Sequence, residues 1–310
     1  MERISSLLDP RLPRGGVGTI GNFDGLHLGH RRILARVLEE ARRLGAPSFL
    51  LTFKPHPVKV LRPEIAPHLI FTPAQKQAAL ETTGLDFMIE LPFTVEFSHL
   101  TGADFVRGVL VERLAVRALM FGEDFHFGYQ KSGNLALLRE MSGPAGFTVE
   151  GIPAVLYGGQ PVSSSRIRFA VLDGDVEGAA VMLAGPFTLE GTVVEGRRKG
   201  KELGFPTVNL DPENELVPGD GIYAAQVRLP GETDWRPAAS SIGVNPTFDG
   251  KTRAVEAFIL DYDGELYGAQ VALRFFKKIR NQEAFSGAEE LVAQIGRDVE
   301  AVRGYFAQER

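Results

Sequence analysis

The chain has 310 residues, of which 44% are hydrophobic and 24% charged, a composition typical of globular proteins that predicts two domains or one large α/β unit. Its net charge of −5 argues against a dedicated nucleic-acid binder, and the absence of cysteine excludes disulfides, thiol catalysis and Cys-based zinc sites. The sequence has neither a signal-peptide pattern nor a run of about 18 apolar residues, so we expect no membrane segment.

The first half of the sequence alternates short apolar runs with segments whose hydrophobic residues recur at helical spacing. Helix-start signals stand at Thr72 with Pro73, and at Thr101 with Asp104. Strands separated by helices predict a parallel sheet with helices on both faces, which binds ligands at the carboxyl ends of its strands. The five predicted strands cover residues 17–21, 48–53, 86–91, 116–121 and 147–152.

The pattern changes near residues 183–191, where short β runs begin to alternate with Gly, Pro and Asp turns. This spacing predicts an antiparallel barrel or sandwich, and an amphipathic helix closes the chain. We therefore expect two domains, 1–184 and 185–310. The apolar stripe of the last helix consists of Leu291, Ile295, Val299 and Val302.

The segment GNFDGLHLGH (21–30) follows the first predicted strand and leads into the first helix. Its glycines, Gly25 among them, allow close backbone approach, and a helix N-terminus favours an anion. His27 and His30 stand three residues apart and could donate hydrogen bonds to one phosphoryl group. A metal-binding pair and two solvated histidines are the alternatives. Neither the P-loop pattern nor the dinucleotide fingerprint GxGxxG is present.

The segment VSSSRIR (162–168) indicates a second phosphate site. Its serines can cap a helix that starts near Arg166, and the guanidinium forks of Arg166 and Arg168 suit phosphate oxygens. A plain serine cap beside surface arginines is the alternative.

Together with TFKPHP (52–57) and FGEDFHFG (121–128), these two segments resemble bacterial FAD synthetases of the nucleotidylyltransferase superfamily, over most of residues 15–170. The resemblance implies a Rossmann-like domain that transfers AMP from ATP to FMN, giving FAD and pyrophosphate, with Mg²⁺ bridging phosphate oxygens. It implies that His27, His30, Asn22 and Gly25 hold the ATP phosphates, that Ser164, Ser165 and Arg166 hold the departing pyrophosphate, and that His56 and Asp124 contact the flavin.

In the second half, residues 195–204 carry four basic and two acidic residues, a local excess that suits a triphosphate, with Gly196 and Lys201 as candidate phosphate contacts. In the next strand Thr207 and Asn209 share one face, and their oxygens could hold Mg²⁺. A solvated hairpin and an outward polar face are the alternatives.

In AVEAFIL (254–260), Val255, Ala257 and Ile259 share one face, whereas Glu256 shares the other with more apolar neighbours. A carboxylate in such a place is a reasonable general base. The alternative is an edge position with Glu256 in water.

The segments GKELGFPTVNL, GIYA, IGVNPTF, VEAFILD, LYG and IRNQEAF resemble the riboflavin kinases over most of residues 185–300. The resemblance implies a small six-stranded antiparallel barrel in which Thr207 and Asn209 bind magnesium and ATP phosphates. It implies that Glu256 takes the proton from the ribityl 5′-hydroxyl as this attacks the γ-phosphate. Phe258, two residues after Glu256, and Gln282, two residues after Arg280, depart from the family pattern; Arg280 is the expected flavin contact.

We therefore expect one bifunctional enzyme that converts riboflavin to FMN and FMN to FAD, with ATP and Mg²⁺, in the cytoplasm. No nucleic-acid or membrane partner is expected, and nothing in the sequence indicates an oligomeric state. The alternatives are an N-terminal nucleotidylyltransferase with a different acceptor and a non-catalytic flavin or nucleotide sensor.

Overall fold

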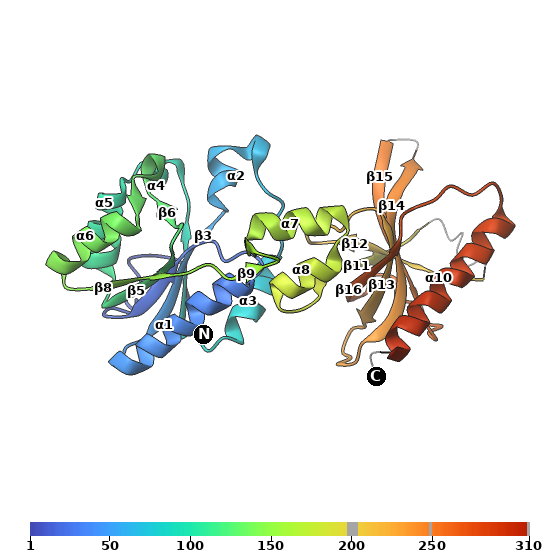
Figure 1. The fold of residues 1–310 in the computed structure, drawn as a ribbon, viewed down its shortest axis with the longest axis horizontal. Helices are drawn as coiled ribbons and strands as arrows, with labels where there is room; N and C mark the ends of the chain where they lie inside the picture. Colours follow the sequence, from blue (N-terminus) through green and yellow to red (C-terminus); the bar gives the residue numbers. More distant parts are fainter. Residues whose placement is uncertain (197–203, 248–249, 309–310) are drawn as a thin grey trace. The chain divides into compact units, whose positions relative to one another are not determined.

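The computed structural model describes residues 1–196, 204–247 and 250–308, and these form two compact units (Figure 1). The first unit consists of Met1–His68 and Pro73–Ser163. The second consists of Ser164–Arg310 together with Leu69–Thr72, a short segment from the first half of the sequence.

The first unit is built on a six-stranded sheet of order β1-β4-β3-β2-β5-β8, in which every pair is parallel. The five predicted strands are confirmed, and β1 is an additional edge strand of only three residues. The strands are β1 (Glu2–Ile4), β2 (Val17–Ile20), β3 (Ser48–Lys54), β4 (Phe87–Pro92), β5 (Ala118–Gly122) and β8 (Thr148–Ile152).

Helices cover both faces of this sheet, as predicted. On one face α1 (Leu28–Leu44) contacts β2, β3 and β5 and buries Leu34 and Val37. On the other, α5 (Gly102–Phe105), η2 (Val106–Arg113, a π-helix) and α6 (Leu135–Ala145) bury their apolar side chains in one core with Phe49 and Leu119. The Thr101 hydroxyl caps α5 by accepting the Asp104 N–H at 3.1 Å, so this predicted helix start is confirmed.

Short elements complete the first unit. They are α2 (Pro57–Leu61), η1 (Pro63–Ile65), α3 (Pro73–Glu81), α4 (Val95–Ser98), β6 (His126–Phe127), η3 (Tyr129–Lys131), β7 (Gly133–Asn134), β9 (Leu156–Tyr157) and β10 (Gln160–Pro161).

The second unit begins with α7 (Ser164–Asp173) and α8 (Val176–Leu183) and continues into a closed barrel of order β11-β12-β15-β14-β13-β16. Every neighbouring pair in the barrel is antiparallel, so the predicted six-stranded antiparallel barrel is confirmed. The strands are β11 (Phe187–Val194), β12 (Val208–Pro212), β13 (Gly221–Arg228), β14 (Arg236–Thr247), β15 (Gly250–Ile259) and β16 (Gln270–Arg280).

The closing helix α10 (Ala288–Gln308) packs against β13, β14 and β16 (Figure 1). Val299 and Val302 are buried there with Ala224 and Leu260, and Ile295 packs against the same cluster. The predicted apolar stripe therefore faces the barrel.

The segment Leu69–Thr72 is bound to the barrel unit by the loop after β12. Buried Asn214 donates from Nδ2 to the Ile70 carbonyl at 3.2 Å and accepts the Glu190 N–H at 2.9 Å, and the Leu69 N–H donates to Glu215 at 3.0 Å. Ile70 is fully buried. A four-residue piece of the N-terminal half thus belongs to the second unit and is hydrogen-bonded to it.

The compact units divide at Ser163/Ser164, whereas we predict the domain boundary at 184/185, after α8. Helix α8 contacts β11 and β16 of the barrel, which explains why it belongs to the second unit. Within the described residues, no helix is both long and apolar enough to cross a membrane.

Candidate functional site

The histidines of the loop 21–30 lie together at the N-terminus of α1. His27 is the N-cap of this helix, and its Nδ1 accepts the His30 N–H at 3.4 Å. Because Nδ1 is an acceptor, the proton of the neutral His27 ring sits on Nε2, where it can be donated to a ligand. The His27 and His30 rings stack with centroids 3.6 Å apart, so the predicted pair forms one unit.

His30 is also stacked on Phe23, at 4.4 Å, and its Nδ1 is buried without a hydrogen-bond partner among the described residues. Burial, aided by His27 and Lys76, holds the pKa of His30 well below its ordinary value. The ring is therefore neutral near pH 7 and is a hydrogen-bonding group rather than a cation.

The loop that presents these rings has unusual backbone geometry. Phe23 has φ +49° and Leu26 φ +41°, both in the left-handed region, and both side chains are buried; Gly25 between them has φ +84°. Such residues cost about 1–3 kcal/mol each and persist only where surrounding packing fixes them. A Cβ on Gly29 would lie 3.1 Å from the His27 ring, so the missing side chain there leaves room for the imidazole.

Three further predicted residues follow the carboxyl ends of adjacent strands. The Asn22 amide, after β2, lies 2.9 Å from Nε2 of His56, after β3, and His56 Nδ1 accepts the Val58 N–H at 3.3 Å. Asp124 follows β5 and is exposed, and its carbonyl oxygen lies 2.8 Å from His126 Nδ1. The strand order β3-β2-β5 places the three at one edge of the sheet.

Sequence reasoning missed Lys76 of α3, whose Nζ donates to the Thr52 hydroxyl at 2.8 Å behind the same loop. Burial lowers its pKa to about 8. A lysine in a mainly polar helix gives no signal of depth in the sequence, because its neighbours in space come from β3 and β4.

Ser164, Ser165 and Arg166 belong to the second unit and form the first turn of α7. The helix begins two residues before the predicted start near Arg166. The serine side chains therefore stand at an N-terminal helix end, which favours an anion.

In the barrel, Asn209 of β12 is the register partner of Glu256 on β15 and of Val194 on β11, and Glu256 is also the partner of Ser241 on β14. Partners directly opposite each other project from the same face of a sheet. Asn209, Glu256 and Ser241 therefore form one polar row across three strands.

The adjacent positions face the barrel core, since Leu210, Val255, Ala257 and Ile259 are buried. The predicted alternation is confirmed, and it puts the polar row on the outer face. Thr207 directly precedes β12, and Lys201 lies outside the described residues. Gly196 lies against Asn209, since a Cβ on it would come within 2.0 Å of Nδ2.

The outer face beside Glu256 is apolar. Phe258 and Phe205 meet edge to face at 5.5 Å and pack with the cluster beneath α10. A planar apolar ligand bound beside the Glu256 carboxylate would therefore contact aromatic side chains.

Arg280 is held by α10. Its Nε and Nη2 donate to the two Asp298 oxygens at 2.9 and 2.7 Å, and the pKa of Arg280 is raised chiefly by these bonds. Gln282, which departs from the family pattern, donates to the Ser241 hydroxyl at 2.9 Å. The sequence did not indicate either contact.

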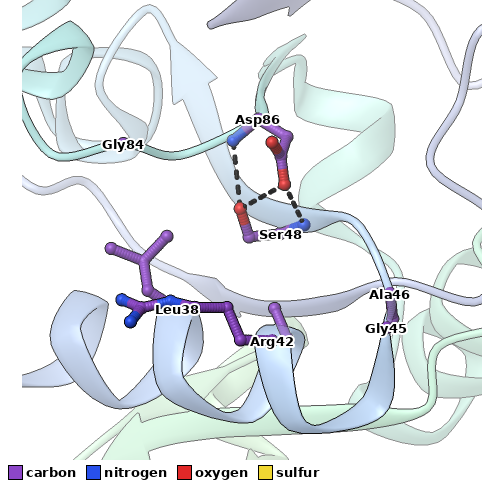
Figure 2. Close-up of a pocket in the computed structure, with 8 residues that line it drawn as sticks. Leu38, Arg42, Gly45, Ala46, Ser48, Gly84 and Asp86 are labelled. Carbon is purple, nitrogen blue, oxygen red and sulfur yellow. Dashed lines mark hydrogen bonds between the residues drawn. The ribbon is translucent and has the colours of Figure 1, made fainter.

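A cavity of about 280 Å³ lies at the opposite edge of the parallel sheet, between the end of α1 and the starts of β3 and β4. Figure 2 shows Ser48 and Asp86, joined by hydrogen bonds of 2.7–3.0 Å, with Leu38 and Arg42 of α1 nearby. Because these polar groups satisfy each other, we assign the cavity to packing rather than to the phosphate site.

Within the part of the chain that the structure describes, no group of three His, Cys, Asp or Glu side chains could hold a metal ion. Thr207 and Asn209 offer only oxygen and amide groups, a donor set that suits Mg²⁺ rather than a transition metal.

Comparison with known proteins matches the two halves of the chain to two family models. A family model described as FAD synthetase matches residues 9–166, and one described as riboflavin kinase matches residues 183–306. The bifunctional riboflavin kinase/FMN adenylyltransferase of Pseudomonas fluorescens is 38% identical, covering 95% of this chain and 94% of that protein. The protein of the same name from Escherichia coli K12 is 35% identical, covering 94% and 93%.

Among solved structures, a Streptococcus pneumoniae protein described as a macrolide-efflux protein has a TM-score of 0.87 and 29% identity, and the match covers 97% of this chain and 98% of that one. The folds of both units therefore have counterparts in that structure.

Proposed function

Because this chain belongs to the family of bifunctional riboflavin kinases/FMN adenylyltransferases, we infer that each half of the chain carries out one of two successive steps of flavin-cofactor synthesis. The enzyme phosphorylates riboflavin to FMN in its C-terminal half and transfers AMP from ATP to FMN in its N-terminal half, giving FAD and pyrophosphate. The residue roles that follow are our proposal.

In adenylyl transfer a phosphate oxygen of FMN attacks the α-phosphorus of ATP, and the bond to the bridging oxygen breaks as pyrophosphate leaves with the electron pair. The step needs positioning and charge stabilisation and no protein nucleophile. We assign His27 and His30 to the ATP phosphates, His27 as a donor through Nε2–H. Asn22 and the Gly25 backbone support the same phosphates.

We assign Ser164, Ser165 and Arg166 to the departing pyrophosphate, because a helix N-terminus, two hydroxyls and a guanidinium favour a polyanion. His56 and Asp124 are proposed flavin contacts. Their support is the position at the carboxyl edge of the sheet, next to Asn22.

In the kinase step we propose that Glu256 takes the proton from the ribityl 5′-hydroxyl while that oxygen attacks the γ-phosphorus and ADP leaves. The observation that supports this role is the register pairing of Glu256 with Asn209, which puts a base beside a phosphate ligand. Thr207 and Asn209 would hold Mg²⁺, which neutralises phosphate charge when bound. Gly196 and Lys201 are proposed ATP contacts, and Arg280 a flavin contact.

We also propose the domain boundary at 184/185, a cytoplasmic location because both steps consume ATP, and no nucleic-acid partner because the chain is net acidic.

Time courses with Mg-ATP, started separately from riboflavin and from supplied FMN, test the assignments. His30→Ala should block only the conversion of FMN to FAD, and Glu256→Ala only the conversion of riboflavin to FMN, so each variant is the folding control for the other. Loss of the same step in both variants would refute the division of labour.

A further inference from the structure

Lys76 is a partly buried cation that the roles above leave unused. Its Nζ donates to the hydroxyl of Thr52, which is fully buried on β3. Thr52 is the register partner of Glu90 on β4, so both lie on the face of the sheet toward which Lys76 reaches.

The Lys76 ammonium is not neutralised by an ion pair with a carboxylate of the described residues. Glu90 is paired with Arg3 of β1 at 2.5 Å, and no carboxylate of the described residues lies within ion-pair distance of Nζ. Three charged groups act on Lys76 from a distance: Glu90 and Asp24 raise its pKa, and Arg3 lowers it. The charge of Lys76 in turn lowers the pKa of His30. A buried ammonium held mainly by a hydroxyl is costly, and such groups concentrate at functional sites.

Lys76 is connected to the histidine loop through Thr52. An ammonium can only donate, so Thr52 Oγ1 accepts from it and directs its own proton to the Asn22 carbonyl, 3.5 Å away. The next residue is Phe23, with its left-handed backbone and its ring stacked on His30. Lys76 therefore stands at the start of a chain of contacts that ends at the imidazole.

We propose that Lys76 is a positioning residue for adenylyl transfer, whose ammonium fixes the loop 21–30 through Thr52 and adds buried positive charge beside the ATP phosphates. In this role it does not touch the reacting atoms. The proposal rests on the assignment of the loop 21–30 to adenylyl transfer.

The protonated state is the active one, so activity is present below the pKa of Lys76 and lost as the pH rises through it. Burial lowers this pKa to about 8 in the free enzyme, and bound ATP, being anionic, must raise it. The basic limb should therefore appear near pH 8 in kcat/KM for ATP and at higher pH in kcat.

The test compares Lys76→Met and Lys76→Arg with Ala74→Met, which adds the same side chain at an exposed position of α3. In Lys76→Met, kcat/KM for FMN adenylylation should fall about ten- to hundredfold and lose the limb near pH 8, with riboflavin phosphorylation and Ala74→Met unchanged. Lys76→Arg should keep most activity without that limb. Thr52→Val should lower activity, with no further loss in combination with Lys76→Met.

Wild-type rates and profile in Lys76→Met, or an equal fall of both activities, would overturn the proposal. If Lys76→Met does not fold, the profiles decide: a limb near pH 8 in the wild type that Lys76→Arg lacks supports the role, and identical profiles refute it. Intact adenylylation in His30→Ala would instead refute the underlying site assignment.

Discussion

Two glycines act at the residue scale by leaving space for a functional side chain. Gly29 leaves room for the His27 ring, and Gly196 leaves room for the Asn209 amide. Neither has a left-handed backbone, so the cost of a methyl group there is steric. At each proposed site, the position of one functional side chain thus depends on a neighbouring glycine that has no side chain.

Gly196→Ala should impair the kinase alone. Its Cβ would lie 2.0 Å from Asn209 Nδ2 and 2.5 Å from Cγ, so the amide must take another rotamer and leave the row with Glu256. We expect about a tenfold lower kcat for riboflavin phosphorylation, since misplacement by an ångström costs this much or more.

The control for this prediction is Gly185→Ala, because a Cβ there meets nothing within 4 Å. FAD formation from supplied FMN, measured in both variants, reports the integrity of the other unit. An unchanged kinase in Gly196→Ala would mean that Asn209 is not a ligand in this rotamer.

Sequence patterns predicted the residues at this scale where a motif fixes local geometry. The loop 21–30 and the strand alternation around Glu256 are local, so His27, His30 and Glu256 could be placed from the sequence. The contacts of Lys76, Arg280 and Gln282 could not be predicted, because each depends on a partner from a distant element.

At the scale of elements, α10 is attached to the barrel by an ion pair as well as by its apolar stripe. The Arg280–Asp298 pair is bidentate and mostly buried, with side chains 15% and 7% exposed. The predicted flavin contact of Arg280 must therefore coexist with a role in holding the helix.

Asp298→Ala should destabilise the barrel unit by about 3–5 kcal/mol, because removing one partner leaves a buried guanidinium uncompensated. Kinase activity should be lost at a lower temperature than in the unsubstituted protein, and before adenylylation, whose histidine loop belongs to the other unit. The measurement is residual activity of each step after heating.

Glu283→Ala is the matched control, since Glu283 is 57% exposed and lies 3.9 Å from the same guanidinium. We expect it to change stability by less than about 0.5 kcal/mol. If the two substitutions lowered the stability of the barrel unit equally, burial of the Arg280–Asp298 pair would not be the cause of the loss.

Edge elements were harder to predict than central ones. Three residues of β1 give no periodicity to count, and only its pairing with β4 makes it a strand. By contrast, each of the six barrel strands has five or more residues, β11 alternates between buried and more exposed positions, and the motifs along these strands resemble a known family.

At the scale of the molecule, sequence order and compact units do not coincide. The FAD synthetase model spans residues 9–166 without interruption, yet Leu69–Thr72 packs with the barrel. Composition and spacing cannot predict that this segment belongs to the barrel unit. Its placement depends on a hydrogen bond from Asn214, about 140 residues later in the chain, to the Ile70 carbonyl.

Ile70→Ala should therefore destabilise the kinase unit, although residue 70 lies within the segment that matches FAD synthetases. Ile70 is 0% exposed, and its truncation should cost about 2–5 kcal/mol. Ile65→Ala, 60% exposed and only five residues away, is the control and should change little. Heating each variant and assaying both steps should show riboflavin phosphorylation failing before adenylylation in Ile70→Ala. If adenylylation fails first instead, the core that Ile70 completes is that of the parallel sheet, and the assignment of Leu69–Thr72 to the barrel unit is wrong.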